Sequence, residues 1–175
     1  MNNLNLLHVS LLDKTNSTNE FCINLIKNNI SINGIVSTEI QINGRGRYGN
    51  KWISKKGNIF LSFYKKIKLQ RDIIKYQYRV LKIVKKFLIK KGLKEQNIQI
   101  KDPNDILINN KKICGILVES YKNNKNLFVI AGIGINLVSS PKLIKYKTTF
   151  LNKFLKKKVN KLDFLEFIKK NFNKL

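Results

Sequence analysis

Apolar residues along the chain follow two patterns, one with the period of a strand and one with that of a helix. Runs of apolar and β-branched residues bounded by glycine, asparagine or proline predict β-strands. Apolar residues three and four positions apart predict helices with one buried side. The strands are expected at residues 6–12, 34–41, 57–64, 97–101, 106–108, 111–120 and 127–137, and the helices at about 18–28, 73–91 and 161–174.

The helices carry recognisable starts, stripes and stops. Ser17-Thr18-Asn19-Glu20 has the form of a capping box, with a hydroxyl at the N-cap and a glutamate three residues later. Gly92 is expected to end the long helix, because glycine suits the backbone conformation past a helix end. The residues predicted to face the core are Phe21, Leu25 and Ile26 in the first helix, Val80, Ile83, Val84, Phe87 and Leu88 in the second, and Leu162, Leu165, Phe167, Ile168 and Phe172 in the last.

Strands and helices alternate irregularly along a chain of 175 residues, a length that suits one domain with a sizeable core. We therefore predict a single α+β domain over residues 1–175, with one mixed β-sheet and helices packed against it. Residues 127–137 are typical of an interior strand. Gly132 and Gly134 lie on one face of that strand, and another element or a ligand is expected to approach it closely there.

The charge of the chain changes this picture little. The net charge is +25, and nearly all of the positive charge is lysine spread along the whole sequence. Lysine, asparagine and isoleucine all have A/T-rich codons, so a biased genome produces this composition without selection for a basic surface. A nucleic-acid-binding face should instead gather arginine and aromatic residues on one element. We therefore expect no specific DNA binding.

The cysteines, the histidine and the hydropathy argue against several further classes. Cys22 and Cys114 are far apart in the sequence, which supports neither a disulfide framework nor a zinc site. His8 lies in an apolar stretch and is expected to be structural. No segment approaches the length of a membrane span, and the start lacks the pattern of a leader peptide. We expect a cytoplasmic protein with no membrane partner.

Residues 41–52 gather two of the four arginines and three of the nine glycines. Glycine lets backbone N–H groups turn towards one anion, and arginine adds a planar fork of donors. The spacing Gly44-x-Gly46-x-x-Gly49 matches a dinucleotide fingerprint by count, but residues 51–54 lead towards a strand rather than a helix. The segment alone leaves two readings open, an anion-binding loop and a solvated basic loop.

A second polar cluster follows the strand at 97–101. Asp102-Pro103-Asn104-Asp105 is typical of a turn, and Asn109-Asn110 is expected to connect a hairpin. The hairpin would bring one of Lys111 and Lys112 back near Asn104 and Asp105. A lysine, an asparagine and an aspartate beside an arginine loop suit a site for phosphate and magnesium.

Taken together, these residues resemble the catalytic domain of the biotin protein ligases. The resemblance covers residues 13 to 137 and implies the class II synthetase-like fold of biotin and lipoate ligases. Any one matching segment is weak, whereas six in the family's order are specific. They are Ser17-Thr18-Asn19, Gln41 with Gly44–Gly49 and Lys51-Trp52, Gly57-Asn58, Lys101–Asp105, Lys111–Glu119 and Gly132–Asn136.

The resemblance implies a ligase that joins biotin to a lysine in two steps. The biotin carboxylate attacks the α-phosphate of ATP with Mg²⁺ present, which gives biotinyl-5′-AMP and pyrophosphate. The acceptor lysine of a biotin carboxyl carrier protein then attacks the mixed anhydride. A carboxylate and a polyphosphate repel, so such a site must supply cations and oriented N–H groups.

The resemblance also assigns roles to individual residues. Lys112, Arg47 and Asp105 are expected to be catalytic, with Lys112 bridging the biotin carboxylate and the α-phosphate and Asp105 also holding Mg²⁺. The residues expected to bind biotin are Ser17, Thr18, Asn19, Gln41, Gly44, Arg45, Arg47, Lys112 and Gly115. Those expected to bind ATP or the adenylate are Arg45, Arg47, Trp52, Lys101, Asn104, Asp105, Lys112 and Asn136.

The sequence departs from the family's pattern at several places. Asp102 stands where tryptophan is usual, Tyr48 and Asn50 stand where arginines are common, and Asn43 replaces a small residue. The family's N-terminal winged helix and C-terminal β-barrel are expected to have no counterpart, and a monomer or a homodimer is expected.

Three other functions remain as alternatives. A lipoate or octanoate ligase or transferase shares the fold, although its Arg-Arg and Gly-Gly-rich motif is not visible. A degenerate biotin binder without catalysis is favoured by Asp102. A basic nucleic-acid-binding module, from a different class, would explain the charge but not the polar motifs.

Overall fold

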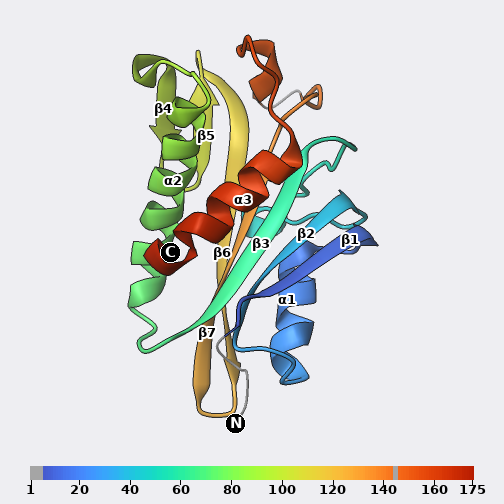
Figure 1. Cartoon of the computed structure of the whole chain (residues 1–175), viewed down its shortest axis with the longest axis vertical. Coiled ribbons are helices and arrows are strands. Elements are labelled where there is room, and N and C mark those ends of the chain that lie inside the picture. The colour runs from blue at the N-terminus through green and yellow to red at the C-terminus, as the bar shows by residue number, and fades with distance from the viewer. Residues whose placement is uncertain (1–5, 144–145) are drawn as a thin grey trace.

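The computed structural model describes residues 6–143 and 146–175, and its centre is one mixed β-sheet of seven strands (Figure 1). The strand order is β1-β2-β3-β7-β6-β5-β4; β1 and β2 are parallel, and all other neighbours are antiparallel. This confirms the predicted α+β class and the interior place of β7. The strands are β1 (His8–Thr15), β2 (Asn33–Gln41), β3 (Ile59–Ile67), β4 (Ile98–Lys101), β5 (Asp105–Ile108), β6 (Lys111–Asn123) and β7 (Asn126–Ile135).

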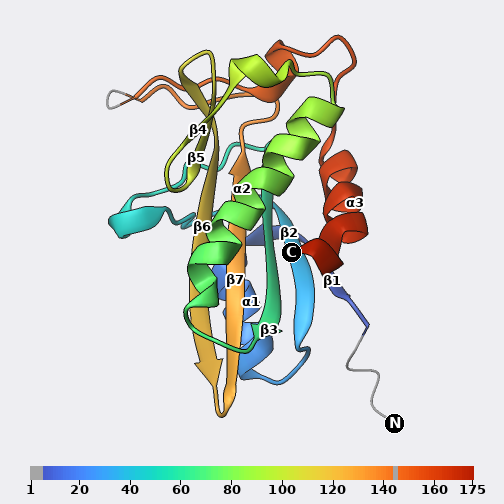
Figure 2. The same cartoon turned by 90° about the vertical axis from the view of Figure 1, so that its left-hand side faces the viewer.

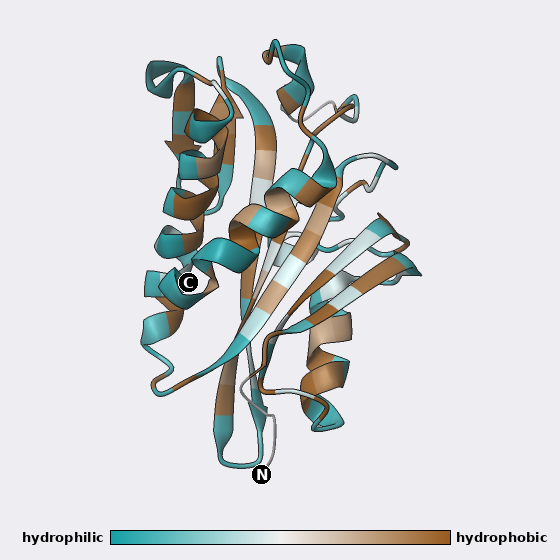
Figure 3. Ribbon diagram, viewed as in Figure 1, coloured by the Kyte–Doolittle hydropathy of each residue, from teal (hydrophilic) through white to brown (hydrophobic). Residues whose placement is uncertain are grey.

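Three helices cover the two faces of the sheet (Figures 1 and 2). Helix α1 (Thr18–Lys27) packs on one face in a small core with residues of β2, β3 and β7. Helices α2 (Asp72–Lys90) and α3 (Lys161–Asn171) pack on the opposite face and form the larger core with all the central strands. Figure 3 shows apolar bands on these helices interrupted by polar residues, as one-sided burial requires.

The long helix α2 confirms its predicted stripe and stop. Its five predicted core residues are all buried. Gly92 follows the helix with a φ of +106°, and the N–H groups of Gly92 and Leu93 bond the carbonyls of Ile89 and Leu88. A residue with a side chain is strained in that conformation, so glycine ends the helix at this point.

The predicted capping box of α1 is wrong. Ser17 is the N-cap residue, but its side chain makes no capping hydrogen bond. The Thr18 N–H instead donates to Gln41 Oε1 of β2 at 2.9 Å, so a distant strand caps this helix. A capping box does form in α3, between Asn160 and Asp163. Phe21 and Leu25 of α1 are only partly buried, whereas Cys22 and Ile26 are fully buried.

The buried side of α3 also differs from the prediction at two positions. Leu162 is 62% exposed, because it lies in the first turn on the solvent side. Phe164, absent from the predicted set, is fully buried, with its ring 4.9 Å from that of Phe87 in α2. The helix ends at Asn171, and a short 3₁₀ turn, Phe172–Lys174, follows.

The hairpin between β5 and β6 has the predicted connection. Asn109 and Asn110 both have positive φ, 49° and 60°. Two such residues form the tight turn whose twist matches that of an antiparallel pair, and asparagine tolerates this conformation better than most residues. Three strands extend beyond their predicted ends: β1 continues through the polar residues Asp13, Lys14 and Thr15, β3 to Ile67 and β6 to Asn123. The predicted end of β7 is wrong, because this strand stops at Ile135, two residues early.

The helices, the two cysteines and the histidine can be compared with what the sequence predicts for membrane spans, disulfides and metal ligands. Among residues 6–143 and 146–175, no helix is long and apolar enough to cross a membrane. Cys22 and Cys114 are both free and buried. His8 lies in β1, and its Nε2 is 2.8 Å from the Ser10 hydroxyl, a local contact consistent with a structural role.

Candidate active site

A cavity of about 710 Å³ lies over the sheet where β6 and β7 run side by side. Its floor is formed by Gly115 and Gly134, which are directly paired, and by Gly132 two pairs further along. The start of α1, the Gly/Arg segment after β2, the turn before β5 and the segment after β7 form the walls. The cavity therefore gathers segments that are far apart in the sequence.

The glycines on the floor are needed because side chains lie directly on them. A Cβ added to Gly134 would lie 2.5 Å from the Trp52 ring, and one added to Gly115 would lie 2.7 Å from it. A Cβ on Gly132 would collide with the Asn19 side-chain oxygen. The close approach predicted for Gly132 and Gly134 is confirmed.

The Gly/Arg segment is itself a hairpin, hereafter the flap (residues 44–52). The Trp52 N–H donates to the Gly44 carbonyl at 2.8 Å, and the Gly46 N–H donates to the Asn50 carbonyl at 2.6 Å. Tyr48 and Gly49 have positive φ at the tip. The flap projects from the sheet beside β6 (Figure 2). Its residues line both the cavity and a second hollow of about 580 Å³.

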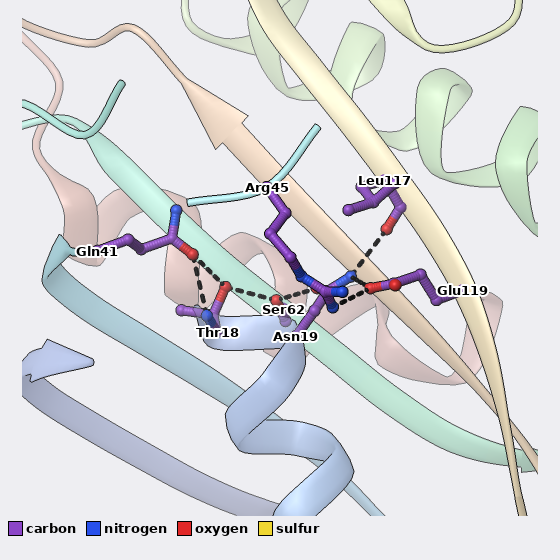
Figure 4. Close-up of polar contacts among 7 residues, drawn as sticks. All are labelled: Thr18, Asn19, Gln41, Arg45, Ser62, Leu117 and Glu119. Atoms are coloured by element: carbon purple, nitrogen blue, oxygen red, sulfur yellow. Dashed lines mark hydrogen bonds and ion pairs between the residues drawn. The ribbon is translucent and has the colours of Figure 1, made fainter. Parts of the chain in front are cut away.

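Polar side chains form a continuous network at one end of the cavity (Figure 4). Thr18 and Asn19 belong to α1, and both are almost fully buried. The Ser62 hydroxyl of β3 lies 2.6 Å from Thr18 Oγ1 and from Asn19 Oδ1. Gln41 Oε1 accepts a hydrogen bond from the Thr18 N–H and lies 3.1 Å from Thr18 Oγ1, and Glu119 accepts one from Asn19.

An ion pair between β5 and β6 also lines the cavity. Lys112 Nζ is 2.8 Å from Asp105 Oδ1, and the two side chains are 15% and 19% exposed. Asn104 Nδ2 donates to the same Asp105 oxygen at 3.0 Å. The hairpin thus brings a lysine back to Asn104 and Asp105, as predicted. The Lys112 ammonium also faces the rings of Trp52 and Tyr146, at 5.5 and 5.1 Å from their centres.

The two arginines of the flap have different partners. Arg45 Nη2 is 2.8 Å from Glu119 Oε2 of β6, so this pair ties the flap to the sheet. Arg47 donates to the Tyr48 hydroxyl and lies over the ring of the same residue, both within the flap. Arg45 and Arg47 both line the cavity.

Most of the residues assigned from the sequence line this cavity. These are Ser17, Thr18, Asn19, Gln41, Arg45, Arg47, Trp52, Asn104, Asp105, Lys112 and Gly115. Gly44 lies instead on the second hollow. Lys101 is exposed on β4 and lines neither space. Asn136 is buried and lines a small hollow next to Trp52 and Lys112, and its amide donates to the Thr149 carbonyl at 3.1 Å.

Three contributors were not assigned from the sequence. Ser62 and Glu119 complete the polar network from β3 and β6. Tyr146 comes from the segment after β7, where the Lys112 N–H donates to the Lys147 carbonyl at 2.9 Å and fixes this segment beside the site. Of the three, only Glu119 could have been found from the sequence, because it lies in Lys111–Glu119, one of the six segments that resemble the family.

The thiol of Cys114, next to Gly115 in sequence, plays no nucleophilic part. Burial and then the charge of Asp105 raise the pKa of this thiol far above its ordinary value, and the opposing effect of Lys112 is smaller. A protonated thiol is a poor nucleophile. The reactive groups of the cavity are therefore its ammonium, guanidinium, carboxylate and hydroxyl groups.

The fold defines the class of protein: it is that of the catalytic domain of solved biotin protein ligases. The ligase of Leishmania major in complex with biotin has a TM-score of 0.80 at 22% identity, over 91% of this chain and 70% of that one. The ligase of Aquifex aeolicus in complex with biotin and ATP has a TM-score of 0.69 at 27% identity, over 97% and 72%. A lipoate protein ligase of Thermoplasma acidophilum shares the fold at 12% identity, with a TM-score of 0.66, over 96% and 85%.

The chain belongs to the biotin/lipoate A/B protein ligase family, whose model matches residues 11–136. It is 35% identical over 131 residues to biotin–protein ligase 2 of Arabidopsis thaliana, covering 73% of this chain and 38% of that protein. It is 34% identical over 139 residues to the bifunctional ligase/repressor BirA of Bacillus subtilis, covering 77% and 42%. The chain thus matches about two fifths of the length of these relatives.

Proposed function

We propose that the chain carries the catalytic site of a biotin–protein ligase, which uses ATP to join biotin to a lysine of a carrier protein. The observation that carries this proposal is the convergence of three groups on one cavity. The polar network around Thr18 and Asn19, the Lys112–Asp105 pair and the arginine flap all line it. The cavity volume, about 710 Å³, is within the range of small-molecule sites.

The polar network suits the head group of biotin. The ureido group of biotin is planar, with one carbonyl and two N–H groups, and the side-chain oxygens of Thr18 and Gln41 can accept a hydrogen bond from such an N–H group. The cavity, about 710 Å³, leaves room for the ring and the alkyl chain beside Trp52. The carboxylate of the chain would then point towards Lys112 and the flap.

The first chemical step joins two anions. A carboxylate oxygen of biotin forms a bond to the α-phosphorus of ATP, the bond from that phosphorus to the bridging oxygen breaks, and pyrophosphate leaves. Lys112 and Arg47 line the cavity where the negative charges must meet, and oriented cations lower the barrier to such a displacement.

The second step uses the mixed anhydride as an activated acyl group. The neutral amine of the acceptor lysine attacks the acyl carbon, the amide forms, AMP leaves, and the amine loses a proton. Water would hydrolyse the anhydride, so the flap has a further role in excluding solvent. The relative in Paracoccus denitrificans, 31% identical over 137 residues, is a biotin–[acetyl-CoA-carboxylase] ligase, which supports a biotin carboxyl carrier domain as the acceptor.

The carboxylate present suits Mg²⁺ bound together with ATP. Among the described residues no group of three or more His, Cys, Asp or Glu side chains could hold a metal. Mg²⁺ is commonly held by one or two carboxylates together with substrate phosphates, and Asp105, with the side-chain oxygen of Asn104, provides such a partial site. When bound, the ion would neutralise phosphate charge. We also propose a cytoplasmic location, where ATP is available.

Exchange of labelled pyrophosphate into ATP tests the proposal directly. The purified chain with Mg²⁺ and no acceptor is expected to catalyse exchange that requires biotin and is not supported by lipoate. Exchange supported by lipoate instead would assign the chain to the other branch of the family. A folded chain without exchange, but with biotin binding, would be a degenerate binder.

A further inference from the structure

Glu119 contacts both the flap and a residue that lines the cavity, hereafter also called the pocket. Its Oε2 accepts a hydrogen bond from Asn19 Nδ2 at 2.7 Å and lies 2.8 Å from Arg45 Nη2 (Figure 4). The side chain is 26% exposed. Among the described residues, Arg45–Glu119 is the one hydrogen bond or ion pair from a side chain of residues 44–51 to another element.

The carboxylate fixes the orientation of the Asn19 amide. An ionised carboxylate and a backbone carbonyl can only accept hydrogen bonds. The NH₂ group of Asn19 faces both Glu119 and the Leu117 carbonyl, at 2.7 and 3.2 Å, and the charged acceptor is the stronger of the two. The Asn19 side-chain oxygen is therefore turned towards the Ser62 hydroxyl.

This orientation determines the direction of every following hydrogen bond. Asn19 Oδ1 cannot donate, so Ser62 must give it its single hydrogen. The contact of 2.6 Å between Ser62 and Thr18 then requires the hydrogen of the Thr18 hydroxyl. Thr18 Oγ1 then has no hydrogen left for Gln41 Oε1, which is 3.1 Å away and already accepts the Thr18 N–H, so both oxygens can accept a hydrogen bond from a ligand in the cavity. The pocket thus ends in two neighbouring acceptor oxygens.

We infer that Glu119 is a positioning residue that makes this end of the pocket selective for a ligand with an N–H donor. The inference rests on the proposed function and deepens it. A ureido N–H of biotin can donate to both oxygens, whereas the dithiolane ring of lipoate has no hydrogen to offer. Glu119 does not touch the ligand. It acts through Asn19, Ser62 and Thr18.

Equilibrium binding of biotin without ATP, measured by calorimetry, is the first test. Glu119→Ala should weaken biotin binding about tenfold, the effect of one hydrogen bond in a buried network. Glu119→Gln keeps the shape and one acceptor oxygen without the charge and should weaken it roughly threefold. Glu95→Ala is the matched control, since Glu95 pairs with Lys85 at 2.7 Å away from the cavity, and it should change binding less than twofold.

A second ligand distinguishes two roles of Glu119, namely selection of an N–H donor and the ion pair that holds the flap through Arg45. Biotin with a methyl group in place of one ureido hydrogen has the same chain and carboxylate but one donor fewer. The ratio of the two dissociation constants, methylated over unmethylated, should be about fivefold smaller in Glu119→Ala than in the wild type. A residue that only holds the flap would weaken both ligands equally and leave this ratio unchanged.

The outcomes are distinct. A smaller ratio in both Glu119 variants, with the control unchanged, supports the inference. An unchanged ratio overturns it, even when pyrophosphate exchange establishes the ligase. A wild-type chain that binds no biotin overturns the proposed function and this inference together. Circular dichroism and thermal unfolding of each variant verify the fold; if Glu119→Ala is unfolded, Glu119→Gln decides.

Discussion

The pair formed by Lys112 and Asp105 offers the sharpest test of how the site works. Lys112→Met removes the ammonium but keeps an unbranched apolar stem of similar length against Trp52. The substitution takes away the cation expected where the carboxylate of biotin and the α-phosphate of ATP meet. Removal of one preorganised donor of this kind typically costs about 10²–10³-fold in rate, so exchange should fall by roughly that factor.

Lys112→Met should also lower the free energy of unfolding. Asp105, 19% exposed, would keep only the hydrogen bond from Asn104. An unpaired, largely buried carboxylate lowers the free energy of unfolding by roughly 1–3 kcal/mol. The double variant Lys112→Met, Asp105→Asn removes both charges and should recover most of that loss. It should not recover exchange.

The assays are urea unfolding and biotin-dependent pyrophosphate exchange at saturating substrates. Lys91→Met is a matched control, because Lys91 pairs with Asp163 at 2.5 Å outside the cavity. This control should lose some stability and keep its exchange rate. Exchange within threefold of the wild type in Lys112→Met, or recovery of exchange in the double variant, would refute the role given to Lys112.

Two further predictions concern packing and pH. Gly134→Ala places a methyl group 2.5 Å from the Trp52 ring, so the indole must move. The free energy of unfolding, measured in urea, should fall by roughly 1–3 kcal/mol. Leu162→Ala, on the solvent side of α3, is the control and should change it little. The backbone N–H of Asn160 donates a hydrogen bond to Asp163 and, with Lys91, lowers the pKa of this carboxyl below its ordinary 3.8. The charged carboxylate therefore stabilises the fold above that pH. This stabilisation is lost as the pH falls through the lowered pKa. The stability gap between the wild type and Asp163→Asn should be present at pH 7 and close below pH 3.8, and a gap that stays constant would contradict this.

Features set by neighbouring residues were predictable from the sequence. The Asn109-Asn110 turn and the Gly92 stop depend on backbone preferences of single residues, and both are found where they were expected. The glycines of β7 were also informative, because a strand interior rarely contains glycine without a close neighbour. The neighbours themselves, Asn19 and Trp52, could not be read from the pattern.

Features set by distant residues were missed. The Ser17–Glu20 segment satisfies the rule for a local cap, yet the helix N-terminus is capped by Gln41, 23 positions further along. Ser62 has no local motif at all; its role comes from the register of β3 beneath α1. Leu162 satisfied the helical period but lies in the first turn, where the helix faces solvent.

The indole on the glycine floor has a practical consequence. Trp52 is the only tryptophan in the chain, and it lies between the paired glycines and the ammonium of Lys112. Its emission spectrum therefore reports on the cavity alone, without interference from any other indole. A ligand that enters, a flap that moves or a lysine that changes partner alters the polarity around this one fluorophore. Ligand binding in this cavity can thus be followed in real time on the unlabelled protein.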